Sequence, residues 1–245
     1  DPEYFQTMME LNMNFSGGIN RVILHGSPFT QAVVNELNYW PGWAFADDYW
    51  GSGYGAWNSR QPLWENVDIF SDYVTRVQGL LQNGTAKIPV LFVGTGNMQS
   101  FLDSGYHYNV AGEDTLMIDE ASPEKVENGI LNPDGLGTQV IVLNGISSVD
   151  DVAFVDRLKE YADRGLKIVL YNGTEISSVN GVEATDLKGS SIPKDKTSAA
   201  VQAAFAKLKE SPNVVTDISN EADLLDFVKK NTDNTVDYDQ SGLEV

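Results

Sequence analysis

The hydrophobic and polar positions of the chain follow two different patterns, which change near residue 85. From there on, short apolar runs alternate with amphipathic segments, and the runs are KIPVLFVG (87–94), TQVIVLNG (138–145), KIVLYNG (167–173) and NVVTDIS (213–219). Apolar runs of this length are typical of strands buried on both faces of a sheet. The amphipathic segments predict helices over 148–165, 197–210 and 220–230. We therefore expect a mostly parallel sheet covered on both faces, a Rossmann-like three-layer α/β domain over residues 85–232.

Of the helices predicted after residue 85, the one over 148–165 has the clearest capping residues at its two ends. Its apolar residues recur at intervals of three and are Val152, Val155, Leu158 and Tyr161. Ser148 or Asp150 can cap its first turn, and Gly165 can end it. A helix with this single apolar face is expected to pack on the sheet.

The first 84 residues predict a different order of elements. Residues 2–14 suit a helix that ends at Gly17-Gly18, and INRVILHG (19–26) then reads as a strand rich in β-branched residues. A long loop follows, and a second helix is expected within 66–84. Its apolar stripe is predicted to be Ile69, Tyr73, Val77, Leu80 and Leu81, with Asn83-Gly84 as the end signal.

Aromatic residues gather in the loop after the predicted strand. All five tryptophans fall in one 25-residue window, at Trp40, Trp43, Trp50, Trp57 and Trp64. An indole face stacks well on the apolar face of a sugar ring, and Arg can hold a hydroxyl with a forked hydrogen bond. Trp57, Asn58 and Arg60 form the most polar cluster of the window and are candidate sugar contacts. Trp64, next to the second helix, is expected to be structural.

Charge and composition narrow the classes of partner. Sixteen basic and 35 acidic side chains give a net charge of −19, which opposes binding to nucleic acid and to anionic membrane surfaces. The sequence has no run of 18 apolar residues. It also has no cysteine, which excludes disulfides, thiolate metal sites and a cysteine nucleophile.

The remaining motifs carry little chemistry. VGTGNMQSF (93–101) places Gly-x-Gly after a strand, but Gln99 stands where a dinucleotide fingerprint needs its third glycine, so we interpret it as a strand-exit turn. NPDGLG (132–137) reads as a turn. His25 and His107 are the only two histidines, so no metal site is expected in this segment. Asp72 and Arg76 are predicted to form a surface ion pair.

Several of these segments together resemble one known family. GGINRVILHG, PGW, WNSRQPLWENVDIFSDYVTRVQGLLQNG and IPVLFVG are similar to the end of the catalytic barrel in glycoside hydrolase family 106, the α-L-rhamnosidases. GYHYNVAGEDTLM, NGILNPDGLGTQVIVLNG and LKEYADRGLKIVLYNG are similar to the glutamine-amidotransferase-like domain that follows the barrel there. VDYDQSGLEV resembles the entry into the family's β-sandwich.

The resemblance implies a division into three parts. Residues 1–84 would be the terminal part of a (β/α)₈ barrel, 85–232 the Rossmann-like domain, and 233–245 a linker into a β-sandwich. INRVILHG would then be the eighth barrel strand, with His25 at the rim that contacts sugar. An apolar strand of this kind needs a partner surface for residues 19–26.

The chemistry implied is hydrolysis of terminal α-L-rhamnosyl or related linkages in plant or bacterial polysaccharides, by an acid and a base carboxylate with water as the nucleophile. Both would come largely from earlier barrel strands, so this segment alone is expected to be inactive. Glu36 is the one weak candidate here, and a solvated loop acid is its simpler interpretation. The resemblance also implies calcium near the sugar in the full-length enzyme, a bacterial source, an extracellular or periplasmic location, and the rest of the polypeptide as a partner.

Two alternative functions stay open at this stage. The segment could belong to a non-catalytic carbohydrate-binding or assembly module that keeps the aromatic loop. It could also belong to a β-galactosidase-like hydrolase whose barrel is followed by a similar trimerisation domain.

Overall fold

The computed structural model describes residues 2–23, 62–96, 98–180 and 198–233. The chain divides into two compact units, Asp1–Gly84 and Thr85–Val245. Each unit has a buried core of its own, and each is described by itself below.

The first unit is built on two helices that share a small core. They are α1 (Pro2–Ser16) and α2 (Val67–Leu81), and α2 is preceded by a 3-10 turn, η1 (Pro62–Asn66). The core side chains are Leu11, Phe15, Phe70 and Val74. The Tyr73 hydroxyl also donates to Asn12 Oδ1 at 2.5 Å, which ties the two helices together beside this core.

The buried face of α2 differs from the predicted stripe. Phe70 and Val74 are buried, and Tyr73 and Val77 of the predicted stripe pack half-buried against the same core. Ile69, in contrast, is 59% exposed and Leu80 is 77% exposed. Apolar residues occupy neighbouring positions on α2, so more than one face is apolar, and α1 covers only the face centred on Phe70 and Val74.

Two other expectations for this unit are wrong in the described residues. Residues 19–23 form no strand; the Val22 amide instead donates to Gln78 Oε1 at 2.7 Å, and Ile23 is 83% exposed. The predicted ion pair between Asp72 and Arg76 is not among the salt bridges of the described residues, which are Lys159–Asp163, Arg164–Glu124 and Lys209–Glu175.

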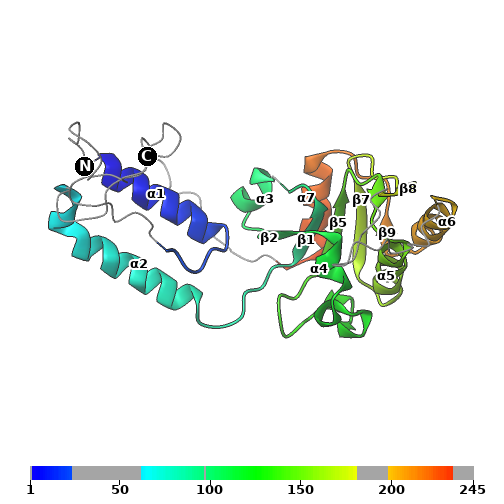
Figure 1. The fold of residues 1–245 in the computed structure, drawn as a ribbon, viewed down its shortest axis with the longest axis horizontal. Helices are drawn as coiled ribbons and strands as arrows, with labels where there is room; N and C mark the ends of the chain where they lie inside the picture. The colour runs from blue at the N-terminus through cyan, green and yellow to red at the C-terminus, as the bar shows by residue number, and fades with distance from the viewer. Residues whose placement is uncertain (1, 24–61, 97, 181–197, 234–245) are drawn as a thin grey trace, which may run out of the picture. The chain divides into compact units, whose positions relative to one another are not determined.

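The second unit is a mixed α/β structure around a parallel sheet (Figure 1). Its strands are β1 (Val90–Gly94), β2 (Tyr108–Ala111), β5 (Val140–Asn144), β7 (Lys167–Tyr171) and β9 (Val214–Val215). They lie in the order β2-β1-β5-β7-β9, and every neighbouring pair is parallel. This confirms the predicted mostly parallel sheet.

Helices cover both faces of this sheet. The helices of the unit are α3 (Gln99–Asp103), α4 (Glu113–Met117), α5 (Val152–Asp163), α6 (Ser198–Lys209) and α7 (Glu221–Asn231). Side chains of α4, α5 and α6 form one core with one face of the strands, and side chains of α3 and α7 form a second core with the other face. Burial on both faces explains why these strands read as continuous apolar runs.

The connection between β1 and β5 contains more structure than the sequence pattern indicates. Besides α3, β2 and α4 it holds η2 (Asp119–Ala121), η3 (Pro123–Lys125) and the antiparallel pair β3 (Val126–Glu127) and β4 (Ile130–Leu131). The predicted turn over 132–137 is confirmed, because the amides of Gly135 and Gly137 both donate to the Asn132 carbonyl at 2.9 Å.

The start of α5 lies later than predicted. Asp151 is the N-cap, and its Oδ1 accepts from the Ala153 amide at 3.2 Å. Ser148 cannot cap the helix because Ser148–Val149 forms a short strand, β6, parallel to β8 (Ser178–Val179). The predicted apolar face is confirmed, since Val155, Leu158 and Tyr161 are fully buried.

The cap gives a direct prediction about stability. Replacing Asp151 by alanine removes the side-chain acceptor of the first turn and is expected to lower the free energy of unfolding by about 1 kcal/mol. Asp156→Ala, at an exposed position within the same helix, is the matched control and should change it by less than about 0.5 kcal/mol. Urea unfolding followed by far-UV circular dichroism measures both, and equal losses would contradict the assignment of the cap.

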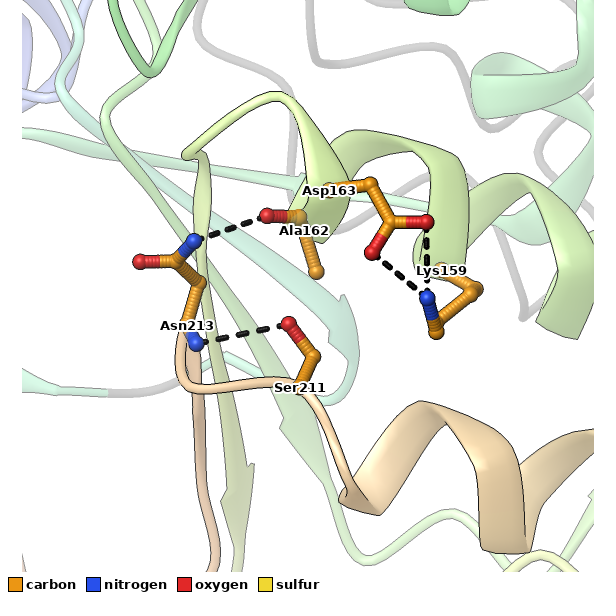
Figure 2. Close-up of polar contacts among 5 residues, drawn as sticks. All are labelled: Lys159, Ala162, Asp163, Ser211 and Asn213. Atoms are coloured by element: carbon orange, nitrogen blue, oxygen red, sulfur yellow. Dashed lines mark hydrogen bonds and ion pairs between the residues drawn. The ribbon is translucent and has the colours of Figure 1, made fainter.

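The end of α5 is tied to the turn that leads into β9 (Figure 2). The Asn213 side-chain amide donates to the Ala162 carbonyl at 2.8 Å, and the Asn213 backbone amide donates to Ser211 Oγ at 3.4 Å. Lys159 and Asp163 pair on the solvent side of the same helix turn, at 2.5 Å. The Asn213–Ala162 hydrogen bond thus ties the turn before the last strand of the sheet to the end of α5.

Candidate functional site

The candidate site lies at the carboxyl ends of the parallel strands. The strand order is 2-1-3-4-5 when the five main strands are numbered along the chain, so the connections diverge between β1 and β5. In doubly wound sheets, ligands bind outside the carboxyl ends of the strands at this switch point. Here the relevant residues follow Gly94 on β1 and Asn144 on β5.

At this switch point polar side chains of the protein are hydrogen-bonded to one another. Asn144 is buried, and its Nδ2 donates to the Thr95 carbonyl at 2.7 Å and to Thr95 Oγ1 at 3.2 Å. Its Oδ1 accepts from Asn172 Nδ2 at 3.2 Å. Both ends of the Asn144 amide are therefore used inside the protein, and one side chain links the ends of β1, β5 and β7.

A second buried polar group closes the neighbouring position. Thr174 Oγ1 lies 2.7 Å from the Leu143 carbonyl and 2.8 Å from the Tyr171 carbonyl, and it accepts from the Ile146 amide at 3.1 Å. The Gly145 amide donates to the same Tyr171 carbonyl at 3.1 Å. The backbone groups that leave β5 and β7 are thus bonded to each other rather than directed at a ligand.

The glycines at the end of β1 are required by close packing. Gly94 has φ +99°, and a Cβ there would lie 2.9 Å from the Asn144 carbonyl oxygen. A Cβ on Gly96 would lie 2.5 Å from Val110 Cγ2. The structure thus gives each glycine of this Gly-x-Gly a packing reason, as the interpretation of a strand-exit turn requires.

Three ionisable or hydroxyl groups lie near this edge on the α7 side of the sheet. Burial raises the pKa of the Tyr171 phenol, and the negative charge of Glu221 raises it further. Glu221, in the first turn of α7, accepts a hydrogen bond from the Ser100 hydroxyl. Tyr171 therefore stays neutral at physiological pH and is not activated as a base or nucleophile.

The other perturbed groups are also structural. Burial raises the pKa of Tyr161, whose hydroxyl is hydrogen-bonded to the carbonyls of Leu116 and Ala121. Hydrogen bonds from its own backbone amide and from Ser122 are the main causes that lower the pKa of the exposed Glu124 carboxyl. Neither group lies at the carboxyl edge of the sheet.

The residues predicted to contact or cleave sugar lie outside the described residues. These are His25, Glu36, Trp57, Asn58 and Arg60. Trp64 is described; it lies in η1, is 38% exposed and is not part of the buried core of its unit.

The described part of the chain contains neither a metal-binding cluster nor a membrane-spanning helix. No group of three or more His, Asp or Glu side chains in 2–23, 62–96, 98–180 and 198–233 is arranged to hold a metal ion. Within the same residues, no helix has both the length and the apolar character needed to cross a bilayer.

The comparisons with known proteins are negative. No family model, no curated protein and no solved structure matches this chain.

The two hydrogen-bonded asparagines, buried Asn144 and exposed Asn172, were missed by the sequence analysis, although the sequence holds a signal for them. β5 ends at Asn144 and β7 is followed directly by Asn172, and a glycine comes next in both cases. Polar residues at or just after the carboxyl ends of two neighbouring parallel strands lie near the same edge of the sheet.

Proposed function

We propose that the chain is a segment of a glycoside hydrolase-like protein of the α-L-rhamnosidase type, in which the α/β unit is a non-catalytic accessory domain. The non-catalytic role of the α/β unit is supported by the hydrogen-bonded side chains at the carboxyl edge of the sheet. Asn144, Thr95 and Asn172 satisfy one another there, at the position where sheets of this topology bind their ligands.

The chemistry of the edge also supports a structural role. Glycoside hydrolysis needs two carboxyl groups across the scissile bond. Near the described edge Glu221 is engaged by Ser100, and the polar groups between β1, β5 and β7 are amides and hydroxyls. The absence of cysteine from the sequence removes the nucleophile that an amidotransferase reaction would use.

Sugar recognition is proposed to come from residues 24–61. This proposal is supported by the tryptophans and polar residues of the aromatic window and by the resemblance to the rhamnosidase barrel. Trp57 would stack on the sugar ring, Asn58 and Arg60 would hold its hydroxyls, and His25 would contribute at the rim. Glu36 stays a weak candidate for an acid or base, with both main carboxylates expected on barrel strands outside this segment.

The proposal is tested with the 245-residue chain and with a longer parent that includes a barrel. The segment should not hydrolyse p-nitrophenyl α-L-rhamnoside above the uncatalysed rate, whereas the parent should. Cleavage of the β-D-galactoside by the parent would instead favour a β-galactosidase-like hydrolase, and sugar binding without cleavage a binding module. Hydrolysis by the segment alone would contradict its assignment as inactive.

Binding by the segment itself has a convenient reporter. All five tryptophans lie between residues 40 and 64, so intrinsic fluorescence reports on that region. Trp57→Ala is expected to weaken L-rhamnose binding by about tenfold, since it removes the stacking surface. Trp64→Ala is the matched control and should leave the affinity within about twofold. Equal effects of the two substitutions would contradict the proposed sugar contact.

A further inference from the structure

An apolar groove lies against β2, the edge strand of the parallel sheet. It has a volume of about 300 Å³, and its walls include three consecutive residues of β2, Asn109, Val110 and Ala111. Leu91 and Leu116, two members of the sheet core, also line it. This groove therefore opens the hydrophobic core to the surface at the edge of the sheet.

Large apolar side chains at the groove stay in contact with water. Ile118 is 48% exposed and Leu136 is 41% exposed, and both line the groove. Exposed apolar surface that is continuous with a core and bordered by polar residues marks an interaction site.

The strand beside the groove has an open edge. β2 is the terminal strand of the sheet and pairs only with β1 among the described strands. Its sequence, Tyr108–Ala111, contains no lysine or proline, the residues that proteins use to block edge pairing. The outer edge of β2 can therefore accept the backbone of an added strand.

The rim of the groove is acidic. A second hollow, of about 470 Å³, shares Glu120, Asn132 and Leu136 with the groove and adds Glu127 and Asp134, so that three carboxylates lie there against one lysine of its lining, Lys125. These three carboxylates take part in none of the ion pairs between described residues. One lysine of this region, Lys87, is already bonded to the carbonyls of Pro133 and Gly135 at 2.7 and 2.9 Å.

From these features we infer that the β2 groove, defined by Leu91, Val110, Leu116, Ile118, Glu120 and Leu136, binds an extended cationic polypeptide segment that adds to the edge of β2. Alternate side chains of an extended segment point the same way, so every second residue would be apolar and would enter the groove. Lysine or arginine residues between them would point to the opposite face of the added strand, and those at its ends would lie beside the carboxylates of Glu120, Glu127 and Asp134.

A polypeptide is favoured over other ligands by two of these observations together. An open strand edge offers backbone hydrogen bonds along a line, which only another extended backbone can use in register. The carboxylates select for positive charge among such segments. This inference concerns the α/β unit and does not rest on the proposed sugar chemistry.

The test uses the full 245-residue chain and a labelled short peptide in which lysine and valine alternate. A peptide of the same composition with its lysines and valines in two separate blocks is the control for charge alone. Fluorescence anisotropy measures the affinity, and hydrogen exchange of the β2 amides reports strand addition. We expect the alternating peptide to bind at least about fivefold more tightly and to slow exchange at Asn109 or Ala111.

Matched charge reversals separate the groove from the general negative charge of the protein. Glu120→Lys should weaken binding by about three- to tenfold, because it places a cation at the rim. Glu210→Lys makes the same change at the exposed end of α6 and should have less than about a twofold effect. Equal effects of both variants, equal affinity for both peptides, or β2 amides already protected by a second copy of the chain would overturn the inference.

Discussion

Replacing Phe92 by alanine is expected to lower the free energy of unfolding of the α/β unit by about 3–5 kcal/mol. Phe92 lies on β1, is fully buried and contacts Phe101 and Tyr108 in edge-to-face geometry, at centroid distances of 5.8 and 5.2 Å. The alanine would leave a cavity between the sheet and α3 and would remove both aromatic contacts. A domain with a total stability of about 5–15 kcal/mol would lose a large part of it.

Urea unfolding followed by far-UV circular dichroism measures this loss. Val110→Ala is the control, because Val110 lies on the neighbouring strand but is half exposed, and it should cost less than about 1 kcal/mol. If Phe92→Ala cost no more than Val110→Ala, the packing assigned to that face of the sheet would be incorrect.

The second large effect is expected at the carboxyl edge of the sheet. Asn144→Ala should lower the free energy of unfolding by about 1–3 kcal/mol, since it removes three hydrogen bonds of a buried side chain, each worth about 0.5–1.5 kcal/mol. The sign of the change is informative. Polar groups held in place for a ligand often cost stability, so their removal is neutral or stabilising.

Asn180→Ala is the matched control for this substitution. Asn180 also forms side-chain hydrogen bonds, to Asp150 and Ser148, but it is exposed, so water replaces the lost partners. Its effect should stay within about 0.5 kcal/mol. A stability at or above that of the wild type for Asn144→Ala would show that the edge is not a structural network.

The strands β1, β5 and β7 could be predicted because they are buried on both faces and therefore appear as uninterrupted apolar runs. β2 could not be predicted in the same way. It is a short edge strand with the sequence YNVA, half exposed, and its pairing with β1 depends on contacts distant in the sequence. Apolar runs in the sequence indicate buried strands, and a half-exposed edge strand does not have such a run.

The buried face of α2 shows a second limit of pattern analysis. Phe70 and Val74 pack against α1, whereas the predicted stripe ran through Ile69 and Leu80. Where apolar residues occupy adjacent positions, periodicity indicates a helix but does not select its buried face. The selection depends on the partner helix, which a local pattern does not contain.

The polar network at the sheet edge was predictable only in part. Asn144-Gly145 and Asn172-Gly173 repeat at the ends of two parallel strands, which is enough to expect two amides at one edge. Their mutual hydrogen bond, and the capture of Thr95 by Asn144, require the register of three strands. Such a register follows from tertiary packing rather than from local sequence.

A titration of the isotopically labelled 245-residue chain with L-rhamnose, followed by backbone amide chemical shifts, tests the central claim most directly. The claim is that sugar is bound by residues 24–61 and that the α/β unit only supports them. Shift changes should concentrate in 24–61 and be absent from Thr95, Asn144 and Asn172. Changes centred on those three residues, or a chain whose amide shifts do not respond to the sugar at all, would contradict the account.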